Sequence, residues 1–215
     1  MRRILKQKEP DEIEPDRIEG RSFGMVRSET KRAMQRQLCI EQGYLCCFCE
    51  SQIEPIGRDM RIAHFVPQDK DHSLELTWSN LYGCCHGNAK KREIPSDERT
   101  APKKLGSELR ALHCDAKQDN ECLDARLRPD SIVDGLILFR PDGSVYCAED
   151  ALTKEVEAKL NLNHPRLKKN RVASLDALIF AATELRQPVE GLIARIPDAS
   201  GRLSPYLSYL LAMVS

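Results

Sequence analysis

Nine cysteines are the residues of this chain whose spacing points most clearly to chemistry. Cys46 and Cys49 form a C-x2-C pair, which lets two thiolates from one tight turn reach the same tetrahedral ion. Further ligands must come from downstream, where Cys85 and Cys114 are the best candidates. We therefore predict a structural zinc site (Zn²⁺) held by Cys46, Cys49, Cys85 and Cys114, with Cys84, His86 and Cys122 as substitutes.

Two other uses of these cysteines fit the sequence less well. Thiols buried as small hydrophobic side chains would not require the C-x2-C turn. A redox C-x2-C pair normally accompanies a βαβ pattern, and none surrounds Cys46 and Cys49. Metal binding is therefore the leading prediction.

A histidine and an asparagine lie between the two halves of this predicted zinc site. The run Ile-Ala-His-Phe-Val-Pro-Gln contains His64, and the run Trp-Ser-Asn-Leu-Tyr-Gly contains Asn80. This order, a C-x2-C pair, a His followed by Pro, W-x-N-L and further Cys, resembles the HNH endonucleases, whose ββα-metal site is commonly held by a zinc knuckle. Together with His113-Cys114-Asp115, the motifs look more narrowly like the PtuB-like HNH effector of Septu and retron-associated anti-phage defence systems, over residues 28–125.

The resemblance implies a role for three residues. His64 would be the general base, Asn80 would tie the ββα loop, and Asp115 would bind a catalytic Mg²⁺ or Mn²⁺, with Asn88 as a lower-ranked ligand. The residue types suit phosphodiester hydrolysis, because a neutral imidazole of pKa about 6.5 can deprotonate water and hard cations prefer oxygen ligands. DNA is the first expected substrate and tRNA or other RNA the alternative.

Ala63 departs from the pattern that the resemblance implies. The family usually has an acidic residue immediately before the His, where it helps to hold the metal. Either another acid such as Asp59, Asp69 or Asp71 substitutes, or activity is reduced. The alternative function is accordingly a non-catalytic zinc-binding scaffold subunit of a defence complex.

The same resemblance implies partners. These are an ATPase subunit of the ABC or OLD type (PtuA-like) and, in retron systems, a reverse transcriptase with its RNA–DNA product. Two basic segments are candidate phosphate contacts, namely 88–112 and the helix bearing Arg166, Lys168, Lys169 and Arg171. No recognition-helix signature is present, which disfavours a zinc-finger transcription factor.

The secondary-structure elements that the sequence predicts around these residues make an α+β chain in three parts. Residues 1–27 form an N-terminal arm, 28–130 the HNH domain with a basic insertion at 88–112, and 131–215 a hairpin with a mainly helical C-terminal region. We expect a helix from Ser28 to Gly43, a small hairpin within 44–67 and a second hairpin about the turn at 141–144. Apolar residues at helical spacing then predict two helices between 152 and 185, and a last short helix that ends near Val214.

The composition of the chain disfavours several classes of protein. The 215 residues include 33 basic and 33 acidic side chains, so the chain is not globally basic and does not coat nucleic acid non-specifically. No apolar run approaches the roughly 20 residues of a membrane span, and the charged start precedes no secretory signal core. These features predict a cytoplasmic protein.

Overall fold

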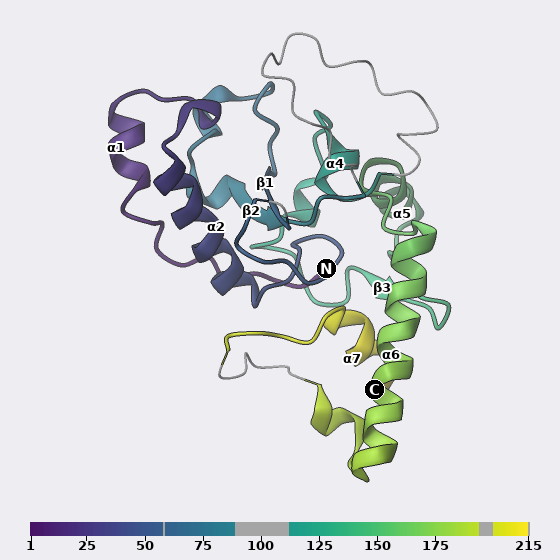
Figure 1. Cartoon of the computed structure of the whole chain (residues 1–215). Coiled ribbons are helices and arrows are strands. Elements are labelled where there is room, and N and C mark those ends of the chain that lie inside the picture. The colour runs from purple at the N-terminus through teal and green to yellow at the C-terminus, as the bar shows by residue number, and fades with distance from the viewer. Residues whose placement is uncertain (58, 89–111, 194–199, 215) are drawn as a thin grey trace.

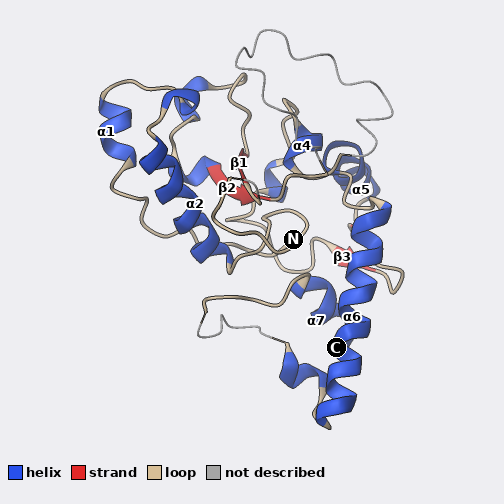
Figure 2. Ribbon diagram, in the orientation of Figure 1, coloured by secondary structure: helices blue, strands red, loops and turns tan. Residues whose placement is uncertain are grey.

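The computed structural model describes residues 1–57, 59–88, 112–193 and 200–214. Helices surround two small antiparallel sheets, so the chain is of mixed α and β structure, as predicted (Figures 1 and 2). The predicted basic insertion falls almost entirely outside the described residues. In the described part of the chain, no helix combines the length and the apolar character needed to cross a membrane.

Helix α2, Ser28–Gln42, supplies the packing surface behind the cysteines. Its buried face includes Met34 and Leu38, which recur at i and i+4 as helical packing requires. Gly43 ends the helix in the left-handed conformation with φ of 58°, as the sequence predicts, and Ser28 is the first helical residue rather than the cap. Ahead of α2 lie α1, Ile13–Ile18, and a single 3-10 turn at Phe23–Met25.

The first residues of the chain pack on the rest of the protein. Ile4 and Ile13 are almost completely buried and belong to the main hydrophobic core. The Lys6 ammonium lies 3.9 Å from the centre of the Trp78 ring and forms an ion pair with Glu41. The N-terminal arm therefore has no core of its own and contributes side chains to one that it shares.

Strands β1, Arg61–His64, and β2, Leu81–Cys84, form the first sheet. They pair antiparallel, with His64 opposite Leu81 and Arg61 opposite Cys84. The two-stranded hairpin predicted within 44–67 is wrong, because β1 pairs with β2, and the described residues before β1 form only a short turn closed by the Leu45–Gln52 bridge and its flanking backbone hydrogen bonds. The residues between the two strands form two 3-10 turns instead, His72–Leu74 and Trp78–Asn80.

The short helix α4, Asp115–Gln118, lies against this sheet and follows the last predicted cysteine ligand. The Gln118 side-chain amide donates to the Phe65 carbonyl, next to His64. A 3-10 turn at Ala125–Leu127 then leads away from the sheet. Helix α4 is thus joined to the residue after β1 by a side-chain hydrogen bond, and it also packs on the π-helical turn Val156–Leu160.

The C-terminal region follows the predicted pattern. Strands β3, Leu138–Phe139, and β4, Val145–Tyr146, pair antiparallel about the expected turn. Helix α5, Asp150–Glu155, continues into a π-helical turn at Val156–Leu160, and α6, Pro165–Leu185, has proline at its first turn. A 3-10 turn, Val189–Leu192, and α7, Leu207–Val214, complete the chain, and α7 packs on α6 and β3.

Candidate metal centre and active site

The C-x2-C pair lies in a tight loop between α2 and β1. The Leu45–Gln52 bridge closes this loop, and the Glu50 amide donates to the Cys46 carbonyl at 3.0 Å across its tip. The side chain of Gln42 fixes the loop to β2, because its carboxamide accepts from the Gly83 amide and donates to the carbonyls of Gly83 and Leu45. Cys46 and Cys49 are consequently held, both buried, beside the end of β2.

The remaining cysteines arrive from two other segments. Cys84 ends β2 and Cys85 follows it, whereas Cys114 precedes α4. Gly87 brings the two segments together, since its carbonyl accepts from the His113 amide at 3.0 Å. Its φ is +59°, and a Cβ there would lie 2.0 Å from the His113 carbonyl oxygen, so this contact requires glycine. The Cys114 amide donates to the Leu160 carbonyl, which anchors the second segment to the C-terminal region.

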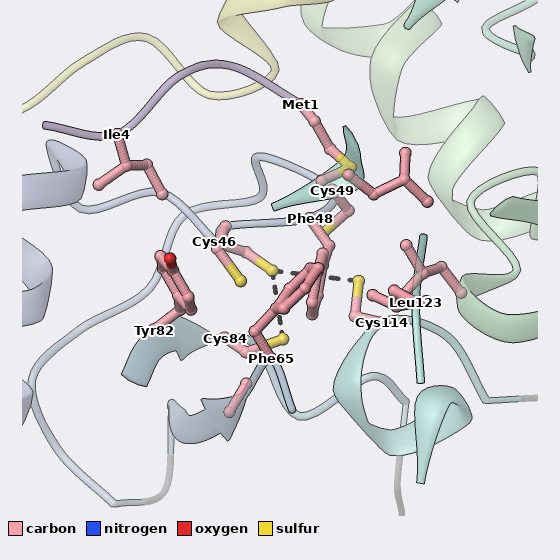
Figure 3. Packing of buried hydrophobic residues seen from close by; sticks show 14 of the residues in the cluster. Met1, Ile4, Cys46, Phe48, Cys49, Phe65, Tyr82, Cys84, Cys114 and Leu123 are labelled. Carbon is pink, nitrogen blue, oxygen red and sulfur yellow. Dashed lines mark hydrogen bonds between the residues drawn. The ribbon is translucent and has the colours of Figure 1, made fainter. Parts of the chain in front are cut away.

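Six sulfur and nitrogen donors converge where these segments meet. Figure 3 shows four of them, Cys46, Cys49, Cys84 and Cys114. They form two groups, and within each group all donor atoms lie within 4.8 Å of one another. One group is Cys46, Cys84, Cys85 and Cys114, and the other is Cys49, Cys85, His113 and Cys114. The measured Sγ–Sγ separations include 3.5 Å for Cys46 to Cys84, 4.0 Å for Cys46 to Cys114 and 3.8 Å for Cys49 to Cys85. This cluster could hold a zinc ion.

All four predicted zinc ligands therefore lie in the cluster, although neither group contains Cys46 and Cys49 together. Of the predicted substitutes, Cys84 belongs to the cluster, whereas His86 and the exposed Cys122 are in neither group. Sequence reasoning missed His113 as a donor. Its position immediately before Cys114 was the available signal.

Burial sets the protonation of the cluster in the absence of an ion. Desolvation lowers the pKa of His113 to about 4, so its imidazole is neutral at cellular pH and free to ligate a metal. Desolvation raises the pKa of the Cys114 thiol well above its ordinary value. A bound divalent cation would offset that cost by stabilising the thiolate.

His64 lies at the end of β1 and is buried, with 7 % of its surface exposed. Its Nε2 lies 3.1 Å from the Glu75 carbonyl oxygen, and since a carbonyl only accepts, Nε2 carries the proton. Nδ1 is then the basic nitrogen, and it accepts from the Gln68 carboxamide at 3.3 Å. Desolvation lowers the pKa of His64, so the neutral base form persists to more acidic pH. Neither Gln68 nor the Glu75 carbonyl was predicted from the sequence.

The side chain of Asn80 holds the loop that follows His64. Its Oδ1 accepts from the Val66 amide at 2.8 Å, and its Nδ2 donates to the carbonyls of Val66 and Leu74. The Asn80 backbone carbonyl accepts from the Phe65 amide. Asn80 thus ties the start of β2 to the residues after β1.

Asp115 lies apart from His64. Its carboxylate contacts the Arg61 guanidinium at 3.3 Å, at the opposite end of β1 from His64. Among the residues that the structure describes, no group of candidate metal ligands contains Asp115 or His64. Ala63 is buried and adds no carboxylate.

Asp59, Asp69 and Asp71 were predicted as possible substitutes for the acid that is absent at position 63, and, over the described ranges, none of them belongs to a candidate metal-ligand group with His64. Asp71 accepts from the amide and hydroxyl of Ser73, and Asp69 accepts from the Asn120 carboxamide. Asp59 lines a cavity of about 630 Å³ together with Cys85 and His86. A preassembled oxygen site for a hard cation is therefore not present in the described part of the chain.

The predicted basic helix is only partly available to phosphates. Arg171 is buried, with 2 % exposed, and donates to the carbonyls of Gly143 and Leu162, so its assignment to a phosphate-binding patch is wrong. Arg166 donates to the side chain of Asn88, and Lys168 forms an ion pair with Asp142. These side chains join elements within the protein.

Comparison with protein-family models gave no match, and neither did comparison with curated proteins. The function proposed below therefore rests on the residues and motifs of this chain.

Proposed function

We propose that this protein is a metal-dependent endonuclease of the HNH type that hydrolyses phosphodiester bonds. The observation that supports this proposal most directly is the position of His64 at the end of β1. There, Nε2 donates a hydrogen bond to the Glu75 carbonyl, and Nδ1 is left as an acceptor. An imidazole oriented through one nitrogen and basic at the other is suited to remove a proton from water. The pairing of β1 with β2, the loop tied by Asn80 and the hydrogen bond from α4 to the Phe65 carbonyl support the proposed ββα arrangement around it.

The proposed reaction begins with proton transfer from water to Nδ1 of His64. The Gln68 carboxamide, which now donates to that nitrogen, would turn to make room for the water. Attack on phosphorus forms the new P–O bond, the bond to the leaving oxygen breaks, and the leaving oxygen takes a proton from a second water. Asp115 is the carboxylate that would hold a Mg²⁺ or Mn²⁺ ion in this proposal, which requires its ion pair with Arg61 to open. Such an ion would supply charge stabilisation for the phosphate.

The cysteine cluster has a structural role in this proposal. One segment that supplies the cluster ends β2 and another begins α4, so an ion bound there would fix the strand and the helix beside His64. Zinc is the natural occupant of a sulfur-rich tetrahedral site because it is stable there without redox change. DNA is the first substrate in this proposal, and tRNA or other RNA is the alternative.

The same proposal places the protein as the toxic effector of an anti-phage complex with an ATPase subunit. Its support is the resemblance of the His64, Asn80 and His113-Cys114-Asp115 motifs to PtuB-like proteins. A retron reverse transcriptase and its RNA–DNA product are the further partners implied.

A second candidate function is a non-catalytic zinc scaffold in such a complex. Ala63 in place of an acid and the ion pair between Asp115 and Arg61 both favour it, because each reduces the oxygen ligands near His64. The two candidates differ in whether the His64 imidazole is needed.

Phage challenge of cells that express the chain with a PtuA-like ATPase separates the two. For a nuclease, His64→Ala abolishes protection while the purified variant keeps its zinc content and its far-UV circular dichroism spectrum. His72→Ala is the matched control, because that histidine is 77 % exposed in its side chain and lies outside the proposed chemistry. Protection by His64→Ala equal to that of the unmodified chain would leave the scaffold as the function.

A further inference from the structure

The donor cluster contains more ligands than one tetrahedral ion uses. Its two groups together comprise five cysteines and one histidine, and they have Cys85 and Cys114 in common. Each group also has two donors of its own, Cys46 and Cys84 in one and Cys49 and His113 in the other. Two tetrahedra that share an edge have this same composition, with two common corners and two separate corners each.

The separations between donors fit a tetrahedron on both sides of the shared pair. Ligands of a tetrahedral zinc ion with Zn–S bonds near 2.3 Å lie about 3.8 Å from one another. On the first side, Cys46 lies 3.5 Å from Cys84 and 4.0 Å from Cys114. On the second side, Cys85 lies 3.8 Å from Cys49 and 3.9 Å from Nδ1 of His113, which is 3.2 Å from Cys114.

Each of the three segments supplies two donors to the cluster. The C-x2-C loop places Cys46 in the first group and Cys49 in the second. In the second segment, Cys84 belongs only to the first group and Cys85 to both groups. In the third segment, His113 belongs only to the second group and Cys114 to both groups. Each segment thus contributes to both groups.

Charge also favours two ions. One Zn²⁺ among five thiolates would leave a net charge of about −3 in a buried site, whereas two ions would leave about −1. With one ion, at least one buried cysteine of the cluster would have to stay a neutral thiol.

We propose that the cluster binds two zinc ions that share the thiolates of Cys85 and Cys114. Cys46 and Cys84 complete the first ion, and Cys49 and His113 complete the second. This inference concerns the structural centre and does not depend on nuclease activity.

Zinc analysis of the purified full-length chain tests the stoichiometry. We expect two zinc ions per unmodified chain. We expect one zinc ion per chain in Cys84→Ser and in His113→Ala, because each substitution removes a donor that belongs to only one group. Cys122→Ser and Cys147→Ser are matched controls because both cysteines lie outside the two groups, and His64→Ala excludes zinc at the proposed catalytic site. All three are expected to keep two ions. Saturation at one zinc per unmodified chain would overturn the proposal.

Cadmium-113 NMR of the substituted protein tests the sharing itself. Two resonances with a resolved coupling to each other are expected, since the coupling passes through a common sulfur. Two uncoupled resonances would mean separate sites, and one resonance would mean a single ion, and either result would overturn the proposal. This measurement uses the unmodified chain, so it remains decisive if a cysteine variant fails to fold.

Discussion

The cysteine cluster and the surroundings of His64 differ in how completely the protein assembles them. At the cluster, three segments bring six donors together, and most of them are buried. At His64 the base is oriented by Glu75 and Gln68, but the nearest predicted metal ligand, Asp115, pairs with Arg61 instead. The difference shows that the sulfur-rich donor set is preassembled, whereas the described residues beside His64 assemble no comparable set of oxygen ligands.

Cys114→Ser is expected to have the largest effect on stability. This substitution removes a donor common to both groups, and zinc binding contributes on the order of 10 kcal/mol to folding in small zinc domains. We expect the free energy of unfolding to fall by about 5 kcal/mol or more, measured by denaturant titration of the zinc-loaded protein. Cys147→Ser, outside the cluster, is the control, and equal stability of the two variants would contradict a structural role for the metal.

Gly87→Ala tests whether the close approach of two segments builds the cluster. The new Cβ would meet the His113 carbonyl at 2.0 Å in a left-handed backbone conformation. We expect a loss of about 2–4 kcal/mol in the free energy of unfolding and weaker zinc retention against a chelator. Gly24→Ala, where the added Cβ has nothing within 4 Å, should change neither quantity appreciably. Unchanged zinc retention in Gly87→Ala would show that the two segments meet without this contact.

Asn80→Asp tests the loop on the His64 side. The carboxylate keeps the acceptor for the Val66 amide but loses the donor to the carbonyls of Val66 and Leu74. Because the Asn80 side chain is buried, we expect a loss of about 1–3 kcal/mol in stability, measured by thermal denaturation, with zinc content unchanged. Loss of zinc from this variant would show that the two regions are not independent.

The pH dependence of stability is the smallest expected effect. The pKa of His64 in the folded protein lies below its ordinary value of about 6.5 because burial disfavours the charged ring. The folded state therefore binds fewer protons, and the stabilisation is present above pH 6.5 and is lost as the pH falls toward the folded-state pKa. Denaturant titrations of the unmodified chain and His64→Gln should converge as the pH is lowered. A parallel decline of the two would contradict a buried, neutral His64.

The sequence predicted the cysteine cluster better than the surroundings of His64 for physical reasons. Cysteines in a reduced chain have few uses, so Cys46, Cys49, Cys85 and Cys114 could be recognised from type and spacing alone. Local signals also predicted the end of α2 at Gly43 and the pairing of β3 with β4, since both depend on neighbouring residues.

The predictions from sequence that were wrong or missing mostly concern contacts between residues far apart in the chain. Strand β1 pairs with β2 across two 3-10 turns, and nothing in residues 44–67 distinguishes that partner from a nearer one. Arg171 looked like a phosphate ligand because arginine is usually exposed, whereas its two carbonyl acceptors come from residues 143 and 162. The partners of His64 could not be predicted either, because one of them is a backbone carbonyl.

Cleavage of plasmid DNA and total tRNA by the zinc-loaded chain tests the central claim most directly. The assay compares the unmodified protein with His64→Ala, each mixed with a PtuA-like ATPase and with or without added Mg²⁺ or Mn²⁺. We predict cleavage that requires the added cation and falls by about 10²–10⁴-fold in His64→Ala, the usual contribution of a general base. Cleavage that persists in His64→Ala, or no cleavage of either polymer by the unmodified complex, would contradict the account.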